Sequence, residues 1–271
     1  MGLRINTNVA AANTARTLRT SNMALKKSLE RLSSGLRINR AADDAAGLAI
    51  AESFRSQVRG FQVAQRNVQD GISLIQTKEG ALSEIGNIMQ RMRELAVQSA
   101  NGTNSTSNRA NLNLEYVELN SAIGEIISRT DFNGTNLFSN TVINIQSGED
   151  AAQITAILGT NTAVTQATLQ TTGSVTDYAT ANTALGAIDA GLIVLNTARS
   201  QLGAAQNRLE FTTNVLAIRE ENAMASESAI RDADIARETT AFTRNQILVN
   251  AGTSMLSQAN FTPQSALQLL G

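Results

Sequence analysis

The stretch Leu185–Leu216, LGAIDAGLIVLNTARSQLGAAQNRLEFTTNVL, repeats a large apolar residue every seven positions. Apolar residues at two places in each group of seven form one stripe along a helix, and such a stripe is the contact face of a coiled coil. The pattern predicts one long helix from residue 181 onward, with a partner helix elsewhere in the chain. The seam residues are Ile188, Leu195, Leu202, Leu209, Leu216, Ala223 and Ile230, with Leu185 and Leu192 in the complementary place.

A second apolar stripe lies in the N-terminal half of the chain. It predicts a helix of about 50 residues, which at 1.5 Å per residue is about 75 Å long. The turn-rich stretch Ser99–Asn111 follows, so we expect a break there and a third helix after it. Burying each large aliphatic residue contributes roughly 1.5 to 3 kcal/mol, so three such helices stabilise one another. The second stripe consists of Phe54, Val58, Phe61, Val68, Ile72, Ile75, Leu82 and Met89, with Gln65 and Glu79 in the remaining positions and Ile85, Met92 and Leu95 on a slightly rotated line; the third consists of Leu112, Tyr116, Leu119, Ile123 and Ile126.

The segment between the third helix and the C-terminal seam has a different character. DFNG, Asp131–Gly134, is a turn signal. Val142–Gln146 and Gln153–Leu158 are short runs of β-forming residues on either side of SGED, which indicates a hairpin. The Thr-rich segment Gly159–Ala181 is expected to form a further strand or a surface loop.

The composition argues against several classes of function. The 271 residues include no cysteine and no histidine, which removes thiolate chemistry, the commonest catalytic base and the commonest metal ligand. A net charge of -1 offers no overall attraction to nucleic acid, and no apolar run approaches the roughly 20 residues of a membrane span. We expect a protein that is not an enzyme, needs no cofactor or metal, binds no nucleic acid and does not insert into a membrane.

Both ends of the chain carry apolar faces that the central helices do not cover. The first 40 residues are basic and have their own heptad stripe, whereas residues 245–271 contain no charged side chain. An exposed apolar helix face is an association surface, so we expect the two ends to pair and to pack against other copies. The apolar residues are Leu18, Leu25, Leu29, Leu32 and Leu36 at the N-terminal end, and Ile247, Leu248, Met255, Leu256, Phe261, Leu267 and Leu270 at the C-terminal end.

The stretch Arg31–Ile50, RLSSGLRINRAADDAAGLAI, interrupts this helix-forming sequence with a Ser-Ser-Gly break and an aspartate pair. The pair is either a metal or catalytic site or part of a joint between two helices. The chain has no histidine and no other acidic cluster nearby, so a joint is the better interpretation. The joint residues are Ser33, Ser34, Gly35, Arg37, Arg40, Asp43 and Asp44.

Each residue type in this joint has an expected role. The Ser-Ser-Gly sequence loosens the end of the first helix, because glycine favours the backbone conformation that ends helices. One of the two aspartates accepts hydrogen bonds from the free N–H groups that open the next helix. The two arginines pair with acids on this or a neighbouring subunit.

Several strings in their order and spacing resemble bacterial flagellin over nearly the whole chain. RINTN, the joint sequence, QDGISLIQTKEGAL, RELAVQSANGT and RTDFNG are similar to its N-terminal half. LGAAQNRLEFTTNVL, SAIRDADIARETTAFTRNQILVNAGTSMLSQAN and the closing LQLLG resemble its C-terminal half. Between them only Thr141–Thr180 is available, so the large variable outer domains that many flagellins carry there should be missing.

The resemblance implies a structural subunit that polymerises into the flagellar filament for swimming motility. It implies export through the flagellar type III secretion channel, assembly at the tip by coiled-coil packing of the terminal helices, and a secreted, extracellular location. The implied partners are other copies of the chain, a flagellar export chaperone, and filament cap and hook-associated proteins. The implied polymerisation and chaperone surface comprises Leu18, Leu25, Leu29, Leu32, Leu256, Phe261, Leu267 and Leu270.

Two other classes compete with a filament subunit. A hook-associated junction protein of the flagellin-like family shares the terminal patterns but is made in few copies, so cellular abundance separates the two. A signalling coiled coil, such as the cytoplasmic hairpin of a chemoreceptor, needs helices symmetric about one turn and no β-hairpin. VINIQSGEDAAQITAIL, residues 142–158, argues against that class.

The predicted fold is mainly α: a long coiled-coil-like helical rod with a small β-hairpin region and paired N- and C-terminal helices. The terminal segments are expected to be disordered in the monomer and helical in the polymer. The expected divisions are an N-terminal inner-tube helix and linker at 1–44, N-terminal rod helices at 45–140, a hairpin and short variable segment at 141–180, a C-terminal rod helix at 181–227, and a C-terminal inner-tube helix at 228–271.

RMREL, Arg91–Leu95, has two interpretations. By itself it is an ordinary helix face with solvated charges. It also resembles the segment that contacts Toll-like receptor 5 in the flagellins that this vertebrate receptor recognises. The resemblance implies receptor-recognition positions at Arg91, Leu95 and, on the third helix, Glu115.

Overall fold

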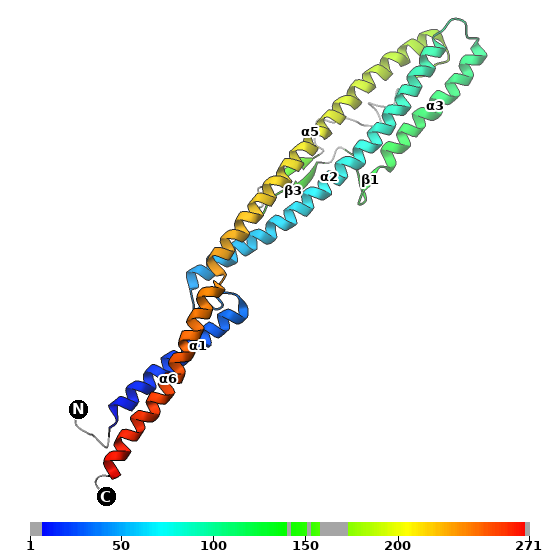
Figure 1. The fold of residues 1–271 in the computed structure, drawn as a ribbon. Helices are drawn as coiled ribbons and strands as arrows, with labels where there is room; N and C mark the ends of the chain where they lie inside the picture. Colours follow the sequence, from blue (N-terminus) through cyan, green and yellow to red (C-terminus); the bar gives the residue numbers. More distant parts are fainter. Residues whose placement is uncertain (1–6, 140–141, 151–152, 158–172, 269–271) are drawn as a thin grey trace. The chain divides into compact units, whose positions relative to one another are not determined.

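The computed structural model describes residues 7–139, 142–150, 153–157 and 173–268 (Figure 1). The chain divides into two compact units, which we call the terminal unit (Met1–Ser56 with Asn222–Gly271) and the central unit (Gln57–Glu221). The predicted mainly α fold with a β-hairpin and paired terminal helices is confirmed. The elements are α1 (Val9–Ser34), α2 (Ala45–Ser99), α3 (Thr106–Arg129), β1 (Asp131–Phe132), β2 (Thr135–Asn136), β3 (Ile143–Gln146), β4 (Ile154–Ile157), α5 (Tyr178–Arg231) and α6 (Ile235–Gln268).

The two long seams form the core of the central unit, where α2 and α5 lie side by side (Figure 1). The seven-residue repeat of α5 is buried there, and so is the predicted stripe of α2. Both helices follow from the apolar repeat, because a long helix in water is stabilised mainly by packing of its apolar face. The buried residues are Ile188, Leu195, Leu202, Leu209 and Leu216 on α5, and Val58, Phe61, Val68, Ile72, Ile75, Leu82, Ile85, Met89, Met92 and Leu95 on α2.

The two polar residues within the α2 stripe make contacts between the helices. Gln65 Nε2 donates to Glu220 Oε2 at 2.9 Å, and Gln62 Nε2 donates to the other oxygen of Glu220 at 2.8 Å. Glu79 pairs with Arg199 at 3.6 Å. Partner numbers fall along α5 as they rise along α2, so the two helices are antiparallel. Polar pairs of this kind favour one register over the others that an apolar seam alone would allow.

Helix α3 covers part of the same core with its buried Tyr116 and Ile123. It begins at Thr106, earlier than the expected Leu112, because Ser105 Oγ accepts a hydrogen bond from the N–H of Asn108 at 3.3 Å and so caps the helix. The predicted break over 99–111 is therefore too long. Only the residues between α2 and α3 form the turn.

The DFNG turn connects β1 and β2, a two-residue antiparallel pair. Asn133 and Gly134 have φ angles of 50° and 77°, the left-handed pair that a tight two-residue hairpin loop requires. Asparagine and glycine are the residues that adopt this conformation at least cost. The expected turn is confirmed.

The predicted second hairpin is also present. Strands β3 and β4 are antiparallel, with Ile143 opposite Ile157 and Gln146 opposite Ile154. The turn of this hairpin lies close to α2, where a Cβ added to Gly60 would be 3.1 Å from the Cβ of Glu149. Of the segment expected to be strand or loop, residues 159–172 lie outside the described residues, and residues 173–177 form no regular element before α5 begins.

The length and composition of helix α5 differ from the expectation that no segment could span a membrane. It is long enough, and contains an 18-residue stretch apolar enough, to cross a membrane by length and composition. The expectation that no segment approaches a membrane span is wrong on that criterion. The seam of α5 packs in the core of the central unit, so the coiled coil accounts for a share of these apolar residues.

Lys78 is a charged residue on the buried face of α2, and the sequence patterns did not single it out. Its side chain is only 3% exposed, and its ammonium lies 5.3 Å from the centroid of the Phe138 ring. Burial lowers the pKa of Lys78 to about 8, because the charged form loses hydration. The contact with the ring offsets part of that cost.

We expect Lys78→Met to raise the free energy of unfolding at pH 7 by about 1 kcal/mol, since methionine occupies similar volume without a charge to desolvate. The native pKa is below that of the unfolded chain, so the wild-type protein gains stability as pH rises from about 8 toward 10.5. The advantage of the variant should therefore shrink over that range. Denaturant unfolding at pH 7 and pH 10 measures this, with exposed Lys26→Met as the control; an advantage that is constant with pH would contradict the explanation.

Candidate functional site: the joint and the terminal helix pair

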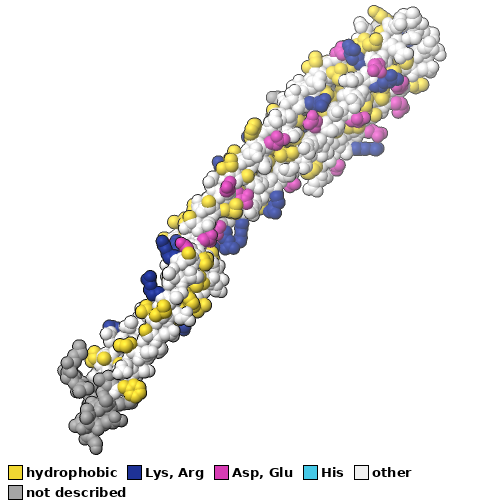
Figure 2. Space-filling view, viewed as in Figure 1, with side chains coloured by type: hydrophobic (Ala, Val, Ile, Leu, Met, Phe, Trp, Pro, Cys, Tyr) yellow, Lys and Arg dark blue, Asp and Glu magenta, His cyan; other side chains and the backbone are white. Residues whose placement is uncertain are grey.

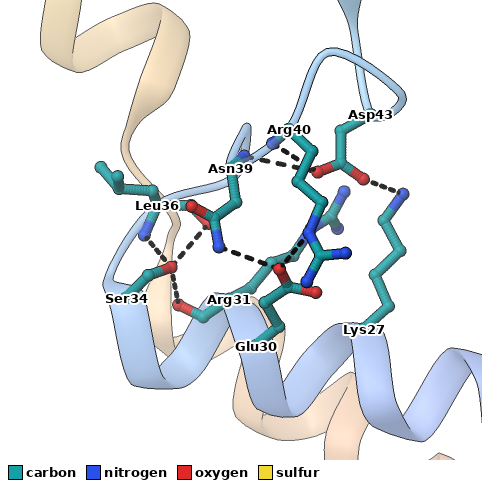
Figure 3. Close-up of polar contacts among 8 residues, drawn as sticks. All are labelled: Lys27, Glu30, Arg31, Ser34, Leu36, Asn39, Arg40 and Asp43. Atoms are coloured by element: carbon teal, nitrogen blue, oxygen red, sulfur yellow. Dashed lines mark hydrogen bonds and ion pairs between the residues drawn. The ribbon is translucent and has the colours of Figure 1, made fainter.

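Helix α1 ends at the Ser-Ser-Gly sequence, as predicted, and Figure 3 shows Ser34 at this end of the helix. Gly35 has a φ of 71°, and its N–H donates to the carbonyl of Arg31 at 2.9 Å. Ser34 Oγ accepts from the N–H of Leu36 at 3.2 Å, while Ser33 is exposed. A left-handed glycine just past the last turn is a common helix stop, because it lets the chain turn away while a carbonyl of the last turn keeps a partner.

Asp44 opens α2, so the predicted cap is confirmed. Its Oδ1 accepts from the N–H of Gly47 at 2.9 Å, which is the bond of a helix N-cap. Gly47 is needed at this position for space as well. A Cβ there would lie 2.4 Å from Asp44 Oδ2 and 2.9 Å from Ile38 Cδ1.

Asp43 holds the loop between the helices rather than a helix end. Its carboxylate pairs with Lys27 Nζ at 2.6 Å and accepts from the N–H groups of Asn39 and Arg40 at 3.3 and 3.2 Å (Figure 3). The hydrogen bond from Lys27 is the main cause that lowers the pKa of Asp43 to about 2, with the two N–H groups adding to it against the effect of burial. These contacts give both aspartates structural roles.

The two arginines of the joint have different partners. Arg40 Nε pairs with Glu30 Oε1 at 2.8 Å, as expected. Arg37 makes no ion pair with a described carboxylate; its guanidinium donates to the carbonyl of Ile230. The expected acid partner for Arg37 is therefore not found within the described part of the chain.

The connection between α5 and α6 forms a backbone bridge with the connection between α1 and α2, and the sequence patterns did not predict this bridge. The N–H of Arg37 donates to the carbonyl of Arg231 at 2.7 Å, and the N–H of Ala233 donates to the carbonyl of Gly35 at 2.9 Å. Leu36 and Asp232 thus form an antiparallel bridge between the two connections. The two interruptions of helical structure, between α1 and α2 and between α5 and α6, therefore lie side by side.

Another aspartate caps the N-terminus of α6. Asp234 Oδ1 accepts from the N–H of Arg237 at 3.1 Å and so opens α6. The signal that could have revealed this break is the pair of aspartates in RDADIARE, because aspartate favours caps over helix interiors.

Helices α1 and α6 pair along the terminal unit. Asn8 Nδ2 donates to the carbonyl of Ala259 at 2.8 Å, and Arg31 pairs with Glu238 at 3.6 Å, so the helices are antiparallel. They approach closely at Gly252, where an added Cβ would be 3.1 Å from Leu18 Cδ1. The expected pairing of the terminal helices is confirmed.

This pair leaves many apolar side chains in water. The best-buried residues of α1 are Ser21 and Ser28, whereas Leu29 is 52% exposed and Phe261 of α6 is 62% exposed. A helix pair that buries serines and exposes leucine and phenylalanine has apolar surface available for further partners. Leu18, Leu25, Leu32 and Leu256 are half-buried, Val9, Met23, Ile247, Leu248 and Met255 are exposed, and the side chains of Leu267 and Leu270 lie outside those that the structure describes.

The three predicted receptor positions lie in the central unit in two different environments. Arg91 and Glu115 are exposed and pair at 2.9 Å between α2 and α3, and Arg91 also contacts Glu94 at 3.0 Å. Leu95 is 1% exposed and belongs to the apolar seam. Of the three positions, only Arg91 and Glu115 therefore present exposed side chains, and Leu95 is buried.

The geometry of the chain agrees with comparisons to known proteins. Residues 5–142 match the bacterial flagellin N-terminal helical region, and residues 185–270 match the bacterial flagellin C-terminal helical region. Flagellin of Halalkalibacterium halodurans is 47% identical over 269 residues, which cover 98% of this chain and 99% of that protein. The chain belongs to the bacterial flagellin family.

Two further relatives add to this identification. The flagellar filament 31.3 kDa core protein of Treponema maltophilum is 44% identical over 284 residues, covering 98% of this chain and 99% of the relative. The crystal structure of Bacillus cereus flagellin matches with a TM-score of 0.50 and 35% identity, over 55% of this chain and 88% of that one. The family and these relatives identify the chain as a structural subunit of a flagellar filament.

Proposed function

We propose that this flagellin assembles through its terminal helices, which pack against the terminal helices of neighbouring copies and line a central channel. The observation that carries the proposal is the apolar surface left by the α1–α6 pair. Figure 2 shows hydrophobic side chains on the visible face of α1 and α6. In a monomer this surface faces water, and each large apolar side chain that a neighbour covers contributes roughly 1.5 to 3 kcal/mol.

The same surface supports the rest of the proposed life cycle. Residues 245–271 carry no charge, so before export they need a chaperone that covers Leu256, Phe261, Leu267 and Leu270. The chain then passes through the flagellar type III secretion channel and is added at the tip of an extracellular filament. Filament cap and hook-associated proteins are its partners at the two ends of that filament.

The alternative of a hook-associated junction protein makes a different prediction about self-association. A junction protein forms a short segment of few copies, whereas a filament subunit extends without limit from a seed. Seeding the purified protein with short filament fragments and viewing it by negative-stain electron microscopy tests the proposal. Long filaments support it, and growth that stops after a short segment favours the junction protein.

We further propose that the exposed Arg91–Glu115 pair is a recognition surface for Toll-like receptor 5. The observation that favours it is a planar guanidinium held between Glu94 and Glu115, with half of the Arg91 side chain still exposed. An oriented, solvent-accessible arginine is a frequent anchor in protein interfaces. Leu95 itself is buried in the apolar seam.

Arg91→Ala should weaken the response of receptor-expressing cells to monomer by roughly tenfold, since an interface arginine of this kind is a typical hot spot. The exposed Arg66→Ala is the control and should leave the response unchanged. Dose–response curves for purified monomer measure both. Full activity of the Arg91 variant would contradict the proposal.

A further inference from the structure

The turn between α2 and α3 contains Asn101–Gly102, one of the two Asn-Gly sequences in the chain. Asn101, Gly102 and Thr103 are all exposed. In an Asn-Gly sequence the backbone nitrogen of the glycine can attack the side-chain carbonyl carbon of the asparagine, because glycine has no Cβ to obstruct the approach. The groups around each asparagine then decide how fast this reaction is.

A hydrogen bond activates the side-chain carbonyl of Asn101. Its Oδ1 accepts from the N–H of Thr103 at 3.2 Å. This bond closes a small ring of atoms that includes both Asn101 Cγ and the amide nitrogen of Gly102, so the side chain is folded toward the amide that attacks it. A donor on a carbonyl oxygen stabilises the negative charge that develops there during the attack.

A guanidinium activates the attacking amide. Arg109 Nη2 donates to the backbone carbonyl of Asn101 at 3.1 Å, and Arg109 Nε donates to the carbonyl of Ser99 at 3.0 Å. The Arg109 side chain is only 14% exposed, and its Nη1 lies 3.8 Å from Asp177 Oδ1, so the guanidinium is held in place. The carbonyl of Asn101 and the N–H of Gly102 belong to one peptide group. A positive charge at the carbonyl oxygen therefore makes that N–H more acidic, and the deprotonated nitrogen is the nucleophile.

The other Asn-Gly sequence, Asn133–Gly134, has a different backbone geometry. Both residues are left-handed, with φ angles of 50° and 77° in the loop between β1 and β2. The left-handed conformation of this type of turn directs the glycine nitrogen away from the asparagine side chain. The pairing of β1 with β2 holds the turn in this form. Asn133 is therefore a slow reference site within the same chain.

We infer that Asn101 is a site of spontaneous deamidation, accelerated by Arg109 and by the N–H of Thr103. The Gly102 nitrogen forms a bond to Asn101 Cγ, the bond from Cγ to the side-chain nitrogen breaks, and ammonia leaves with the former Gly102 amide proton. Water then opens the cyclic imide at either carbonyl, so position 101 becomes an aspartyl or an isoaspartyl residue. The modified form accumulates with the age of the molecule, and the inference is independent of the proposed assembly.

Incubation of the purified full-length protein at 37 °C and pH 8, followed by peptide mass spectrometry, tests the inference. Deamidation at Asn101 should be roughly tenfold faster than at Asn133, because only Asn101 has both activating groups. It should also be at least as fast as in a synthetic peptide of residues 98–106, which has the same sequence without the fold. Equal rates at Asn101 and Asn133, or a slower rate at Asn101 than in the peptide, would overturn the inference.

Two variants separate the roles of the arginine and the glycine. Arg109→Gln should slow deamidation at Asn101 about fivefold, since a hydrogen bond of this kind contributes about 1 kcal/mol, and should leave Asn133 unchanged. Gly102→Ala adds its Cβ to open space, so it keeps the fold, and should slow the reaction roughly tenfold by obstructing the attack.

The matched control for the arginine variant is Arg129→Gln, the same substitution at an exposed arginine of α3, which should leave the rate at Asn101 unchanged. Circular dichroism verifies that each variant keeps its helical content. An unchanged or faster rate at Asn101 in Arg109→Gln would show that mobility of the turn, and not the guanidinium, controls the reaction. An unchanged rate in Gly102→Ala would exclude attack by the Gly102 nitrogen.

Discussion

Removal of residues 245–271 should leave a soluble, largely helical protein that no longer forms filaments. The deletion removes most of α6, including Ile247, Met255 and Phe261, whose side chains are more than half exposed. It leaves α2, α3 and α5 intact, and their core contains the large buried residues of the central unit. Sedimentation and seeded electron microscopy measure the loss of polymerisation, and circular dichroism measures the retained helix.

A full-length variant separates the effect of the apolar surface from the effect of chain length. Ile247→Ser, Met255→Ser and Phe261→Ser together keep every residue of α6 but remove three exposed apolar side chains, and polymerisation should also fail. Val97→Ser, which removes an exposed apolar residue of similar kind from α2, is the matched control and should polymerise normally. Filament growth by the truncated protein would show that the terminal helices are not the assembly surface.

The same surface predicts a difference between monomer and polymer. A lone α1–α6 pair buries serines and exposes leucines, so it gains little from folding by itself. We expect residues 1–44 and 228–271 to exchange their amide hydrogens quickly in the monomer and slowly in the filament. Equal protection of these segments in both states would contradict assembly-coupled folding.

The long helices could be predicted because Leu195, Leu202 and Leu209 recur every seven residues. This period places them on one face of a helix, and that apolar face needs a partner helix to cover it. The hairpin could be predicted because its β-forming runs flank a turn sequence. A division between two C-terminal helices was expected at 227/228, whereas α5 ends at Arg231 and α6 begins at Ile235. The apolar repeat does not indicate the position of this break, because Ile230 continues it up to the last residues of α5. The helix ends there because of the backbone bridge between Leu36 and Asp232 and the cap at Asp234. The spacing of apolar residues gives no information about such polar contacts.

In the candidate site, too, the local contacts could be predicted from the sequence and the tertiary contacts could not. Gly35 and Asp44 act within a few residues of their own position, so the sequence identified the glycine and limited the cap to one of two aspartates. Arg37 bonds a carbonyl 193 positions away, which depends on tertiary packing. Leu95 was assigned to both the apolar stripe and the receptor surface, and its burial agrees with the stripe, because a leucine at a seam position is stabilised by leaving water.

Replacing Asp43 and Asp44 together with alanine should impair filament assembly or change filament shape while leaving the central unit folded. Asp44→Ala removes the α2 cap, a loss of about 1 kcal/mol, and Asp43→Ala releases both Lys27 and the loop N–H groups. In the proposed assembly, neighbouring subunits constrain the position of α1, and the joint connects α1 to α2. Asp44→Asn is the control, because asparagine caps a helix nearly as well as aspartate.

The contribution of Asp43 should also depend on pH in a defined direction. Its native pKa of about 2 is lower than the ordinary value of 3.8, so its stabilising effect is complete above about pH 4 and disappears as pH falls toward 2. The rate of proteolytic cleavage between α1 and α2 measures the stability of the joint, with a neutral protease at pH 7 and an acid protease at pH 2. The cleavage rates of wild-type protein and Asp43→Asn should therefore differ at pH 7 and converge near pH 2. A difference that persists at pH 2, or a metal ion detected in the wild type by elemental analysis and lost in the double alanine variant, would show that these carboxylates do something other than hold the joint.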